Sequence, residues 1–369
     1  MKLNKMFAAL LRYIRFYKNE INWIMLEILE DRTSIYADSK NHSFAYRTKI
    51  TCIPSYLHHR LKISSDNIGS IAAMSGSLLE GYITHSGEPV SNETLEPLPS
   101  FSKENSLMIT GASISSFLDA LFRIKELNNS WTEFLYMDIT SKDNASCLRN
   151  MFCNRTAVIA SELNTRTELP NESVCIDTFS LDILRAMLNK PSTFNLKLEK
   201  NNLYLFNKAE SFSYSIKNKD DLTQDRINTI TKFISMPNKD SKASLVLEKE
   251  TLASLLGVLK LYSKEPKNPK EDVYARKVNF VSDRTKQIFL EGFDQIVNLG
   301  KIKPSASLNT YFSAKRLLPL VSFVSDTDSG TTYFDFGNKL SHFPNQIYFA
   351  AISCNDSVTR YTVLAPLCI

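Results

Sequence analysis

The chain has 369 residues, of which 43% are hydrophobic and 22% charged, and its formal net charge is +5. This composition is that of an ordinary globular protein long enough for two or three domains, and its slight positive charge permits an anionic partner without requiring one. No apolar run reaches the roughly 18 residues of a membrane-spanning helix, and charged residues interrupt the N-terminal segment where a signal peptide has its apolar core. We therefore expect no membrane partner.

The residue types that usually carry catalysis or bind metals form no recognisable motif. The six cysteines include no CxxC pair, so buried reduced thiols and a reducing, cytoplasmic location are expected. The five histidines lack ligand spacing, and the ten glycines form neither a dinucleotide-binding motif nor a P-loop. The signatures GxSxG and HExxH are also missing from the sequence. These observations predict a protein without metal, cofactor or catalytic activity.

The N-terminal third begins with apolar residues at helical spacing, Met6, Leu10, Leu11 and Ile14, which predict a helix over 3–17. Alternating polar and apolar residues then predict strands at 22–29, 33–38 and 43–50. Pro54 falls in the first turn of a short predicted helix over 53–61. Two further strands are expected at 67–75 and 77–84, before a polar, proline-containing loop over 86–104.

The same pattern begins again in the middle third. A helix is predicted over 115–127 and another over 180–189, each preceded by a short strand, at 106–109 and 173–177. Strands are expected after the first helix at 133–140, 146–152 and 156–163. Strands are expected after the second helix at 194–199, 202–207 and 211–216.

A third repetition closes the chain. Helices are predicted over 249–262 and 314–325, again after short strands at 244–247 and 308–313. Pro319 lies inside the second helix, where we expect it to kink or shorten the helix. The strands that follow these helices are predicted at 273–282, 285–291, 295–300, 331–336, 346–354 and 360–367.

The recurrence predicts six units of a helix followed by strands, grouped as three pairs. The expected fold class is α+β, with three repeated domains at 1–104, 105–236 and 237–369, each built from two helix-plus-antiparallel-sheet halves. A generic mixed-sheet protein whose parts are similar by accident remains the alternative on periodicity alone.

Four stretches resemble the β subunit of bacterial DNA polymerase III, the DNA sliding clamp. Residues 33–48 resemble the strand, turn and strand of its first domain, and Met151-Phe-Cys-Asn-Arg-Thr-Ala-Val158 resembles the "TDGHRLAV" segment of its middle domain. Residues 174–216 resemble the second half of the middle domain. Residues 308–369 resemble the C-terminal half, whose family ending is "YVVMPMRL". Together these stretches extend over nearly the whole chain.

The chain also departs from the family pattern. The family's glycine and histidine in the middle-domain turn are Cys153 and Asn154 here. The segment before the third domain is replaced by 220–235, and the 86–104 loop is long. These departures leave the shape of a peptide pocket undetermined. They suggest a divergent clamp encoded by a virus or phage.

The resemblance implies a closed homodimeric ring with helices lining the hole, which encircles duplex DNA independently of sequence and has no catalytic residues. Each expected helix carries a basic residue on it or just past its end, and phosphate contacts by such residues hold DNA without reading its sequence. Solvated helix faces are the alternative explanation. The candidate DNA-binding residues are Arg12, Arg15, Lys18, Arg60, Arg123, Lys125, Arg185, Lys190, Lys260, Lys264, Lys315 and Arg316.

The resemblance also implies a hydrophobic groove that takes linear peptide motifs of a DNA polymerase, a clamp loader and other clients. The apolar C-terminus fits this role, because most soluble chains end in polar residues. An ordinary turn and core strand is the alternative for 151–156. The candidate peptide-binding residues are Met151, Cys153, Asn154, Arg155, Thr156, Val363, Leu364, Ala365, Pro366 and Leu367.

Two other functions remain open at this point. A clamp-fold transcription accessory factor that couples RNA polymerase to DNA would keep the basic helices and the groove. A non-enzymatic structural repeat protein would need neither. Identifying the bound partners would separate a transcription factor from a replication clamp, because the first would bind an RNA polymerase and the second a DNA polymerase. The shape of the particle would separate a structural repeat protein from either clamp.

Overall fold

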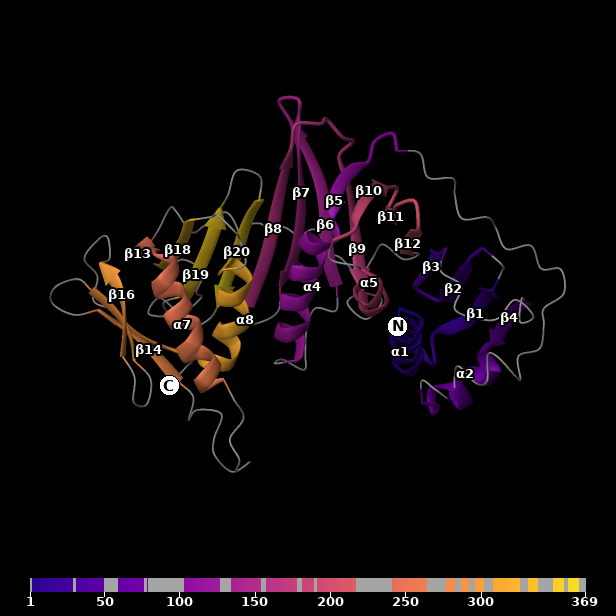
Figure 1. Cartoon of the computed structure of the whole chain (residues 1–369), viewed down its shortest axis with the longest axis horizontal. Helices are drawn as coiled ribbons and strands as arrows, with labels where there is room; N and C mark the ends of the chain where they lie inside the picture. Colours follow the sequence, from indigo (N-terminus) through magenta and orange to yellow (C-terminus); the bar gives the residue numbers. More distant parts are fainter. Residues whose placement is uncertain are drawn as a thin grey trace. The chain divides into compact units, whose positions relative to one another are not determined.

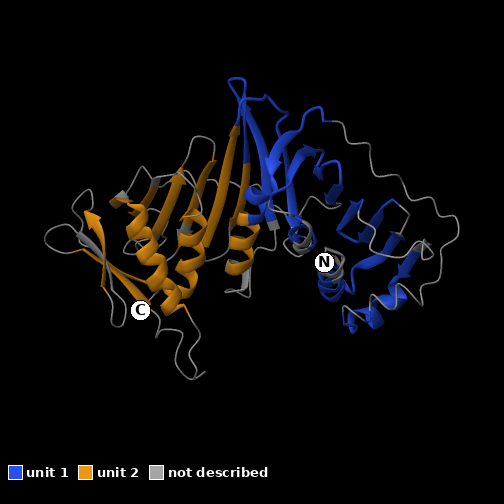
Figure 2. Cartoon of the chain, viewed as in Figure 1, with its two compact units in different colours: residues 1–115, 133–148, 165–222 blue, residues 116–132, 149–164, 223–369 orange. Residues whose placement is uncertain are grey.

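The computed structural model describes residues 2–28, 31–49, 59–75, 78, 103–126, 134–153, 157–177, 181–188, 191–216, 241–263, 277–282, 287–291, 296–301, 308–325, 331–337, 348–354 and 358–364. These residues form two compact units (Figure 2). Unit 1 comprises 1–115, 133–148 and 165–222, and unit 2 comprises 116–132, 149–164 and 223–369. The predicted middle domain contributes to both units, and the three-domain division stays a prediction.

Unit 1 is built on an antiparallel sheet in the order β4-β1-β2-β3-β12-β11-β10-β5 (Figure 1). The antiparallel pair β6 and β9 also belongs to this unit. Its elements are α1 (Lys2–Tyr17), β1 (Ile21–Ile28), β2 (Thr33–Ser39), β3 (His42–Thr48), β4 (His59–Ser64), α2 (Ser65–Ala72), β5 (Leu107–Thr110), β6 (Phe134–Lys142), β9 (Glu172–Asp177), α5 (Leu181–Met187), β10 (Thr193–Glu199), β11 (Asn202–Phe206) and β12 (Glu210–Ile216).

Unit 2 contains antiparallel strands in the order β13-β18-β19-β20-β8 and a four-stranded sheet in the order β16-β15-β14-β17. Its elements are β13 (Ser241–Leu247), α7 (Lys249–Tyr262), β14 (Lys277–Ser282), β15 (Gln287–Glu291), β16 (Ile296–Lys301), β17 (Asn309–Ser313), α8 (Ala314–Ser325), β18 (Thr331–Gly337), β19 (Tyr348–Cys354) and β20 (Val358–Leu364). Three elements contribute residues to both units, namely α4 (Gly111–Glu126), β7 (Ala145–Cys153) and β8 (Ala157–Thr165).

A strand, a helix and three strands recur in chain order, as in β13-α7-β14-β15-β16 and β17-α8-β18-β19-β20. The leading strand of each half pairs with the other half: β13 pairs with β18, and β17 pairs with β14. In unit 1, β5 pairs with β10 and β9 pairs with β6 in the same way. This exchange joins consecutive halves through backbone hydrogen bonds, so neither half can separate without breaking a strand pairing.

Tight turns of predictable chemistry close two of the hairpins in unit 1. Asp143 and Asn144 connect β6 to β7, and Lys200 and Asn201 connect β10 to β11, with φ between 49° and 64° at all four residues. Two-residue hairpin loops favour left-handed conformations because their twist matches that of the flanking strands. Asn and Asp tolerate that conformation better than most residues, so the local sequence sets the register of both hairpins.

Aromatic side chains fill the interior of unit 2 between its two sheets. Phe349 of β19 is fully buried and lies 4.7 Å from the ring of Phe334 and 5.7 Å from that of Phe280, measured between centroids. The Phe280 ring is also 5.7 Å from that of Phe312. Edge-to-face and offset contacts of this kind add to the stabilisation that burial alone provides. Phe334 and Phe336 at alternate positions of β18, together with Phe280 of β14, therefore join the two sheets.

The structure confirms most predicted elements to within a few residues, but the segment after β3 differs. Residues 59–61, expected at the end of a helix, belong to strand β4, and residues 67–72, expected in a strand, belong to helix α2. Leu61 and Ile63 alternate with polar neighbours and are buried against β1, a strand pattern that the helix prediction overlooked. Ile68 and Ile71 are buried at helical spacing, although Gly69 and the serines disfavour a helix. Residues 53–58, 77 and 79–84 of these predictions lie outside the described residues.

Helix α8 runs through Pro319 to Ser325, so this proline does not shorten it. Proline lacks the N–H that would bond to the carbonyl of Lys315, at a cost of about 3 kcal/mol in a helix interior. Leu317, Leu320 and Val321 of the same helix are fully buried. Burial of each large apolar side chain is worth about 1.5–3 kcal/mol, which is enough to offset the missing hydrogen bond.

Candidate functional site

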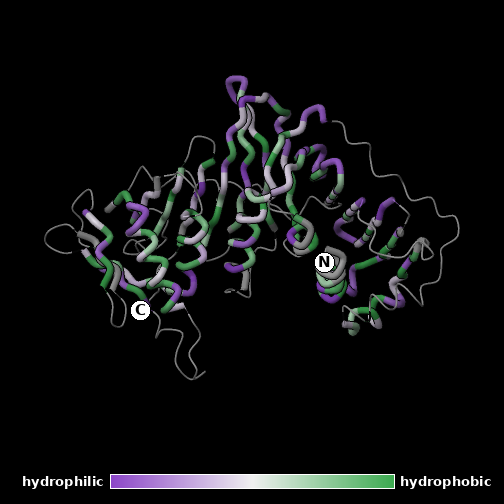
Figure 3. The backbone as a smooth tube through the Cα atoms, viewed as in Figure 1, coloured by the Kyte–Doolittle hydropathy of each residue, from purple (hydrophilic) through white to green (hydrophobic). Residues whose placement is uncertain are grey.

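Helices α7 and α8 of unit 2 bury one side and expose basic residues on the other. In Figure 1 both helices lie in front of strands β18 to β20, and in Figure 3 hydrophobic and hydrophilic segments alternate along them. Leu255 and Leu259 of α7 are fully buried, whereas Lys260 is exposed. Lys315 of α8 is also exposed and Arg316 is half-buried. This arrangement is that of amphipathic helices packed on a sheet with cations directed to solvent.

Helix α1 of unit 1 follows the same pattern. Leu10 and Ile14 are fully buried, and Arg12, Arg15 and Lys18 are exposed, with Lys18 one residue past the end of the helix. Helix α1 contacts α5. The α5 residue Arg185 is half-buried. Arg123 of α4 is exposed in the same way as Arg12 and Arg15 of α1.

Arg15 has a structural partner as well. Its Nε donates a hydrogen bond to the carbonyl of Ala72 at 2.8 Å, and its Nη2 donates to the carbonyl of Met74 at 2.6 Å. Ala72 is the last residue of α2, where the carbonyls of a helix lack donors within the helix. Arg15 therefore holds the C-terminal end of α2 against α1, and this contact occupies part of the guanidinium that the sequence assigned to DNA.

The remaining predicted cations are less well defined or misplaced. Arg60 lies in strand β4, so its predicted position at the end of a helix is wrong, whereas its contact with DNA stays a prediction. The alternation that buries Leu61 and Ile63 is the strand pattern of this segment. Lys125 belongs to α4, but its side chain lies outside the described residues. Lys190 and Lys264 also lie outside them.

The predicted peptide groove adjoins the pairing of β8 with β20 in unit 2. Ala157, the first residue of β8, lies opposite Leu364, the last residue of β20. Residues 154–156 precede Ala157 in sequence and residues 365–367 follow Leu364, so the two predicted walls begin at one pair of strand ends. Met151 and Leu364 are each 1% exposed and are part of the core in this conformation. Residues 154–156 and 365–367, and the side chains of Cys153 and Val363, lie outside the described residues.

The sequence analysis did not identify a buried arginine in strand β20. Arg360 of β20 is 8% exposed, and its Nη1 donates a 2.6 Å hydrogen bond to the carbonyl of Phe323 in the last turn of α8. The guanidinium also lies 4.9 Å from the centre of the Phe323 ring, and this ring contacts Phe117 of α4. A single charged residue inside an otherwise uncharged strand was the signal in the sequence. The side chain ties α8 to β20, four residues before Leu364 of the predicted groove.

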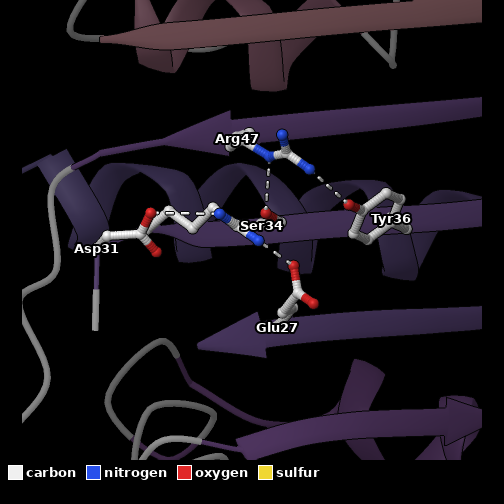
Figure 4. A network of polar contacts seen from close by, with 6 residues as sticks. Glu27, Asp31, Ser34, Tyr36 and Arg47 are labelled. Atoms are coloured by element: carbon white, nitrogen blue, oxygen red, sulfur yellow. Dashed lines mark hydrogen bonds and ion pairs between the residues drawn. The ribbon is translucent and has the colours of Figure 1, made fainter. Parts of the chain in front are cut away.

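A network of polar contacts on β1, β2 and β3 of unit 1 was also not predicted. Figure 4 shows Arg47 between the hydroxyls of Ser34 and Tyr36, each 3.4 Å from a guanidinium nitrogen. A second arginine, Arg32, lies 4.0 Å from the carboxylate of buried Glu27 and 3.2 Å from that of Asp31. Tyr36 packs with Met25, Ala45 and Trp23. These contacts hold the side chains on one face of β1, β2 and β3 in place, and they do not form an open binding site.

Burial is the main cause of the raised pKa values of Cys175 and Tyr46 in unit 1. Burial raises the pKa of the Cys175 thiol to about 12. Burial, together with the charge of Glu210, raises the pKa of Tyr46 well above its ordinary value, although a hydrogen bond with Thr48 lowers it. Both groups are therefore neutral at physiological pH, and the thiolate that a reactive cysteine needs does not form at Cys175.

Across the described residues, no group of three or more His, Cys, Asp and Glu side chains could hold a metal ion. Within the same part of the chain, no helix is long and apolar enough to cross a membrane.

Comparison with known proteins defines the class of fold. No family model matches the chain, and no curated protein matches it significantly. Solved structures, in contrast, match over almost the full length, and the chain has the fold of the DNA polymerase III β subunit, the sliding clamp of bacteria.

Three structures illustrate the likeness. The DNA polymerase sliding clamp of Bacillus subtilis is 12% identical with a TM-score of 0.58, covering 100% of this chain and 97% of that one. The DNA polymerase III β chain of Streptococcus pneumoniae is 11% identical with a TM-score of 0.54, and coverage is 98% of each chain. The Helicobacter pylori β clamp bound to a DNA ligase peptide is 10% identical with a TM-score of 0.54, again with 98% of each chain covered.

Proposed function

We propose that this protein is a DNA sliding clamp, a non-catalytic processivity factor that encircles duplex DNA and tethers a polymerase to it. The observation that carries the proposal is the fold likeness to sliding clamps over at least 97% of each chain in these three comparisons. In this proposal two chains form a closed ring, and their helices line the hole.

The exposed cations of the helices support the DNA contact. Arg123, Lys260 and Lys315 lie on three different helices and all reach solvent. Lys and Arg that contact phosphates bind DNA through counterion release, without sequence readout, and leave the protein able to move along the duplex. A tethering ring needs this combination of attraction and mobility.

The partner proteins would bind through short linear peptides at the groove formed by 151–156 and 363–367. The register of Ala157 with Leu364 supports this, because both predicted walls adjoin that one strand pair. The Helicobacter pylori clamp, of the same fold, was solved with a DNA ligase peptide. We infer that a DNA polymerase and a clamp loader are the clients here, and that an extended peptide gains affinity by burying apolar side chains in the groove.

Charge reversal tests the DNA contact. The variant Arg123→Glu, Arg185→Glu, Lys260→Glu should lose retention on DNA. In a salt titration, the slope of log K against log [salt] should become shallower by about 0.9 for each phosphate that the variant no longer neutralises, up to about 2.7 in all. A matched control reverses three exposed lysines on strands and hairpins, Lys142, Lys200 and Lys301, and should change the slope much less. Equal retention and equal slopes for both variants would contradict the assignment of the helices to DNA.

Truncation tests the client site. Deleting 366–369 should abolish capture of polymerase-derived peptides, while sedimentation should show that the truncated protein keeps the oligomeric state of the full-length protein. Full peptide binding after the deletion would contradict the assignment of client binding to this groove.

A further inference from the structure

One face of the main strands of unit 2 exposes large apolar side chains. In β13, Leu245 and Leu247 are buried, but Val246 between them is 57% exposed. In β18, Phe334 is fully buried, but its neighbour Tyr333 is 40% exposed. Successive side chains of a strand point to opposite faces, so Val246 and Tyr333 lie on the face opposite the buried core.

The strand register aligns these side chains across the sheet. Val246 lies opposite Tyr333, Tyr333 opposite Ile352, and Ile352 opposite Tyr361. Directly opposed residues have Cβ atoms about 4.5–5.5 Å apart, a spacing at which neighbouring side chains are within reach of one another. We call these four residues the cross-strand row. It ends at β8, where Ala160, the partner of Tyr361, is fully buried.

Polar groups border the cross-strand row. Thr359 of β20 lies opposite Cys354 on one side and Glu162 on the other. The Tyr361 hydroxyl donates a hydrogen bond to Glu162 at 3.3 Å, and Arg149 lies 4.0 Å from the same carboxylate. An apolar centre with a polar, partly solvated border is the usual anatomy of a surface that binds another protein.

The size of the row decides between possible occupants. A stable interface between folded proteins buries roughly 800 Å² on each partner and uses about 20–30 residues a side, far more than four side chains supply. Four adjacent strands span about 14 Å, from three spacings of about 4.8 Å. An extended peptide places side chains of one face about 6.6 Å apart, so three alternate side chains, within about five residues, match the row.

We propose that the cross-strand row is a docking site for a short extended peptide with apolar side chains at alternate positions. The row and the groove at 151–156 and 363–367 share strand β20, where Tyr361 lies two residues before Val363, and the row extends from there across β19 and β18 to β13. The proposal does not depend on DNA binding. The aromatic rings of Tyr333 and Tyr361 offer contact area at low entropic cost, because each has only two torsions to fix.

The test uses a defined probe, the fluorescein-labelled peptide Lys-Ser-Leu-Ser-Phe-Ser-Leu-Ser-Lys, and the full-length protein. A second peptide of the same composition, with its three apolar residues contiguous, serves as a pattern control. Fluorescence anisotropy should give at least tenfold tighter binding for the alternating peptide. The variant Val246→Ser, Tyr333→Ser should weaken that binding at least tenfold, while its circular dichroism and melting stay close to those of the wild type.

A matched variant makes the same kinds of change away from the row. Leu261→Ser, Tyr311→Ser replaces an exposed aliphatic residue and an exposed tyrosine of unit 2, 55% and 36% exposed, and should leave peptide binding within twofold of the wild type. Equal affinity for both peptides, no binding at millimolar peptide, or unchanged binding by the Val246→Ser, Tyr333→Ser variant would overturn the proposal. Self-association of the wild type that this variant alone abolishes would assign the row to a second copy, and would also overturn it.

Discussion

Replacing Arg360 by methionine should destabilise unit 2, because the guanidinium joins α8 to β20. Methionine keeps most of the volume but removes the 2.6 Å hydrogen bond to the Phe323 carbonyl and the contact with the Phe323 ring at 4.9 Å. A hydrogen bond from a charged donor contributes about 1.5–3 kcal/mol, and a desolvated cation–π contact up to about 2 kcal/mol. Relief of the desolvation of the buried charge opposes both terms. We expect a net loss of about 1.5–3 kcal/mol.

A double-mutant cycle separates the two contributions. Phe323→Leu keeps the carbonyl that accepts the hydrogen bond and removes only the ring. The coupling energy between Arg360→Met and Phe323→Leu, measured by urea unfolding, should therefore report the ring contact and lie at about 0.5–2 kcal/mol. An Arg360→Met protein within about 0.5 kcal/mol of the wild type, or more stable than it, would refute the idea that this arginine stabilises the junction.

Other contacts of the two units give three more predictions. Phe349→Ala should cost about 3–5 kcal/mol by calorimetry, because it opens a cavity among fully buried rings, whereas Tyr311→Ala on the surface should cost far less. Burial raises the pKa of the Cys175 thiol from 9.0 to about 12, so the unfolded chain loses the thiol proton at lower pH than the folded protein does. The free energy of unfolding should therefore fall by about 1 kcal/mol between pH 9 and 10. Urea titrations at each pH should show that Cys175→Ala removes this part of the decline. Arg15→Met should speed amide exchange in α2 at least several-fold, with exchange in β10 as the internal control; equal exchange in α2 would exclude its role at the helix end.

The elements that the sequence predicts well are those whose pattern and burial agree. In β13, β18 and β19, buried residues alternate with less buried ones, and α7 places Leu252, Leu255 and Leu259 at helical spacing on its buried side. The β4–α2 segment was mispredicted because local propensity and tertiary packing disagree there. Ser65, Asn67 and Gly69 are weak helix formers, and packing of Ile68 and Ile71 overrides them.

The candidate site was harder to predict than the fold. Exposed cations on a helix can be located from spacing alone, as with Lys260 and Lys315, because a helix must bury its apolar face. The contact of Arg15 with the end of α2 joins residues 57 and 59 positions apart, and no local pattern encodes it. The cross-strand row likewise depends on the register of four strands, which a single sequence does not fix.

Electron microscopy of the purified protein in negative stain would show whether it forms a ring that can encircle DNA, as the proposed function requires. We expect annular particles of two chains, with a central hole wide enough for duplex DNA. Compact or elongated particles without a hole, at concentrations where the protein is fully assembled, would contradict the proposal that this protein is a sliding clamp.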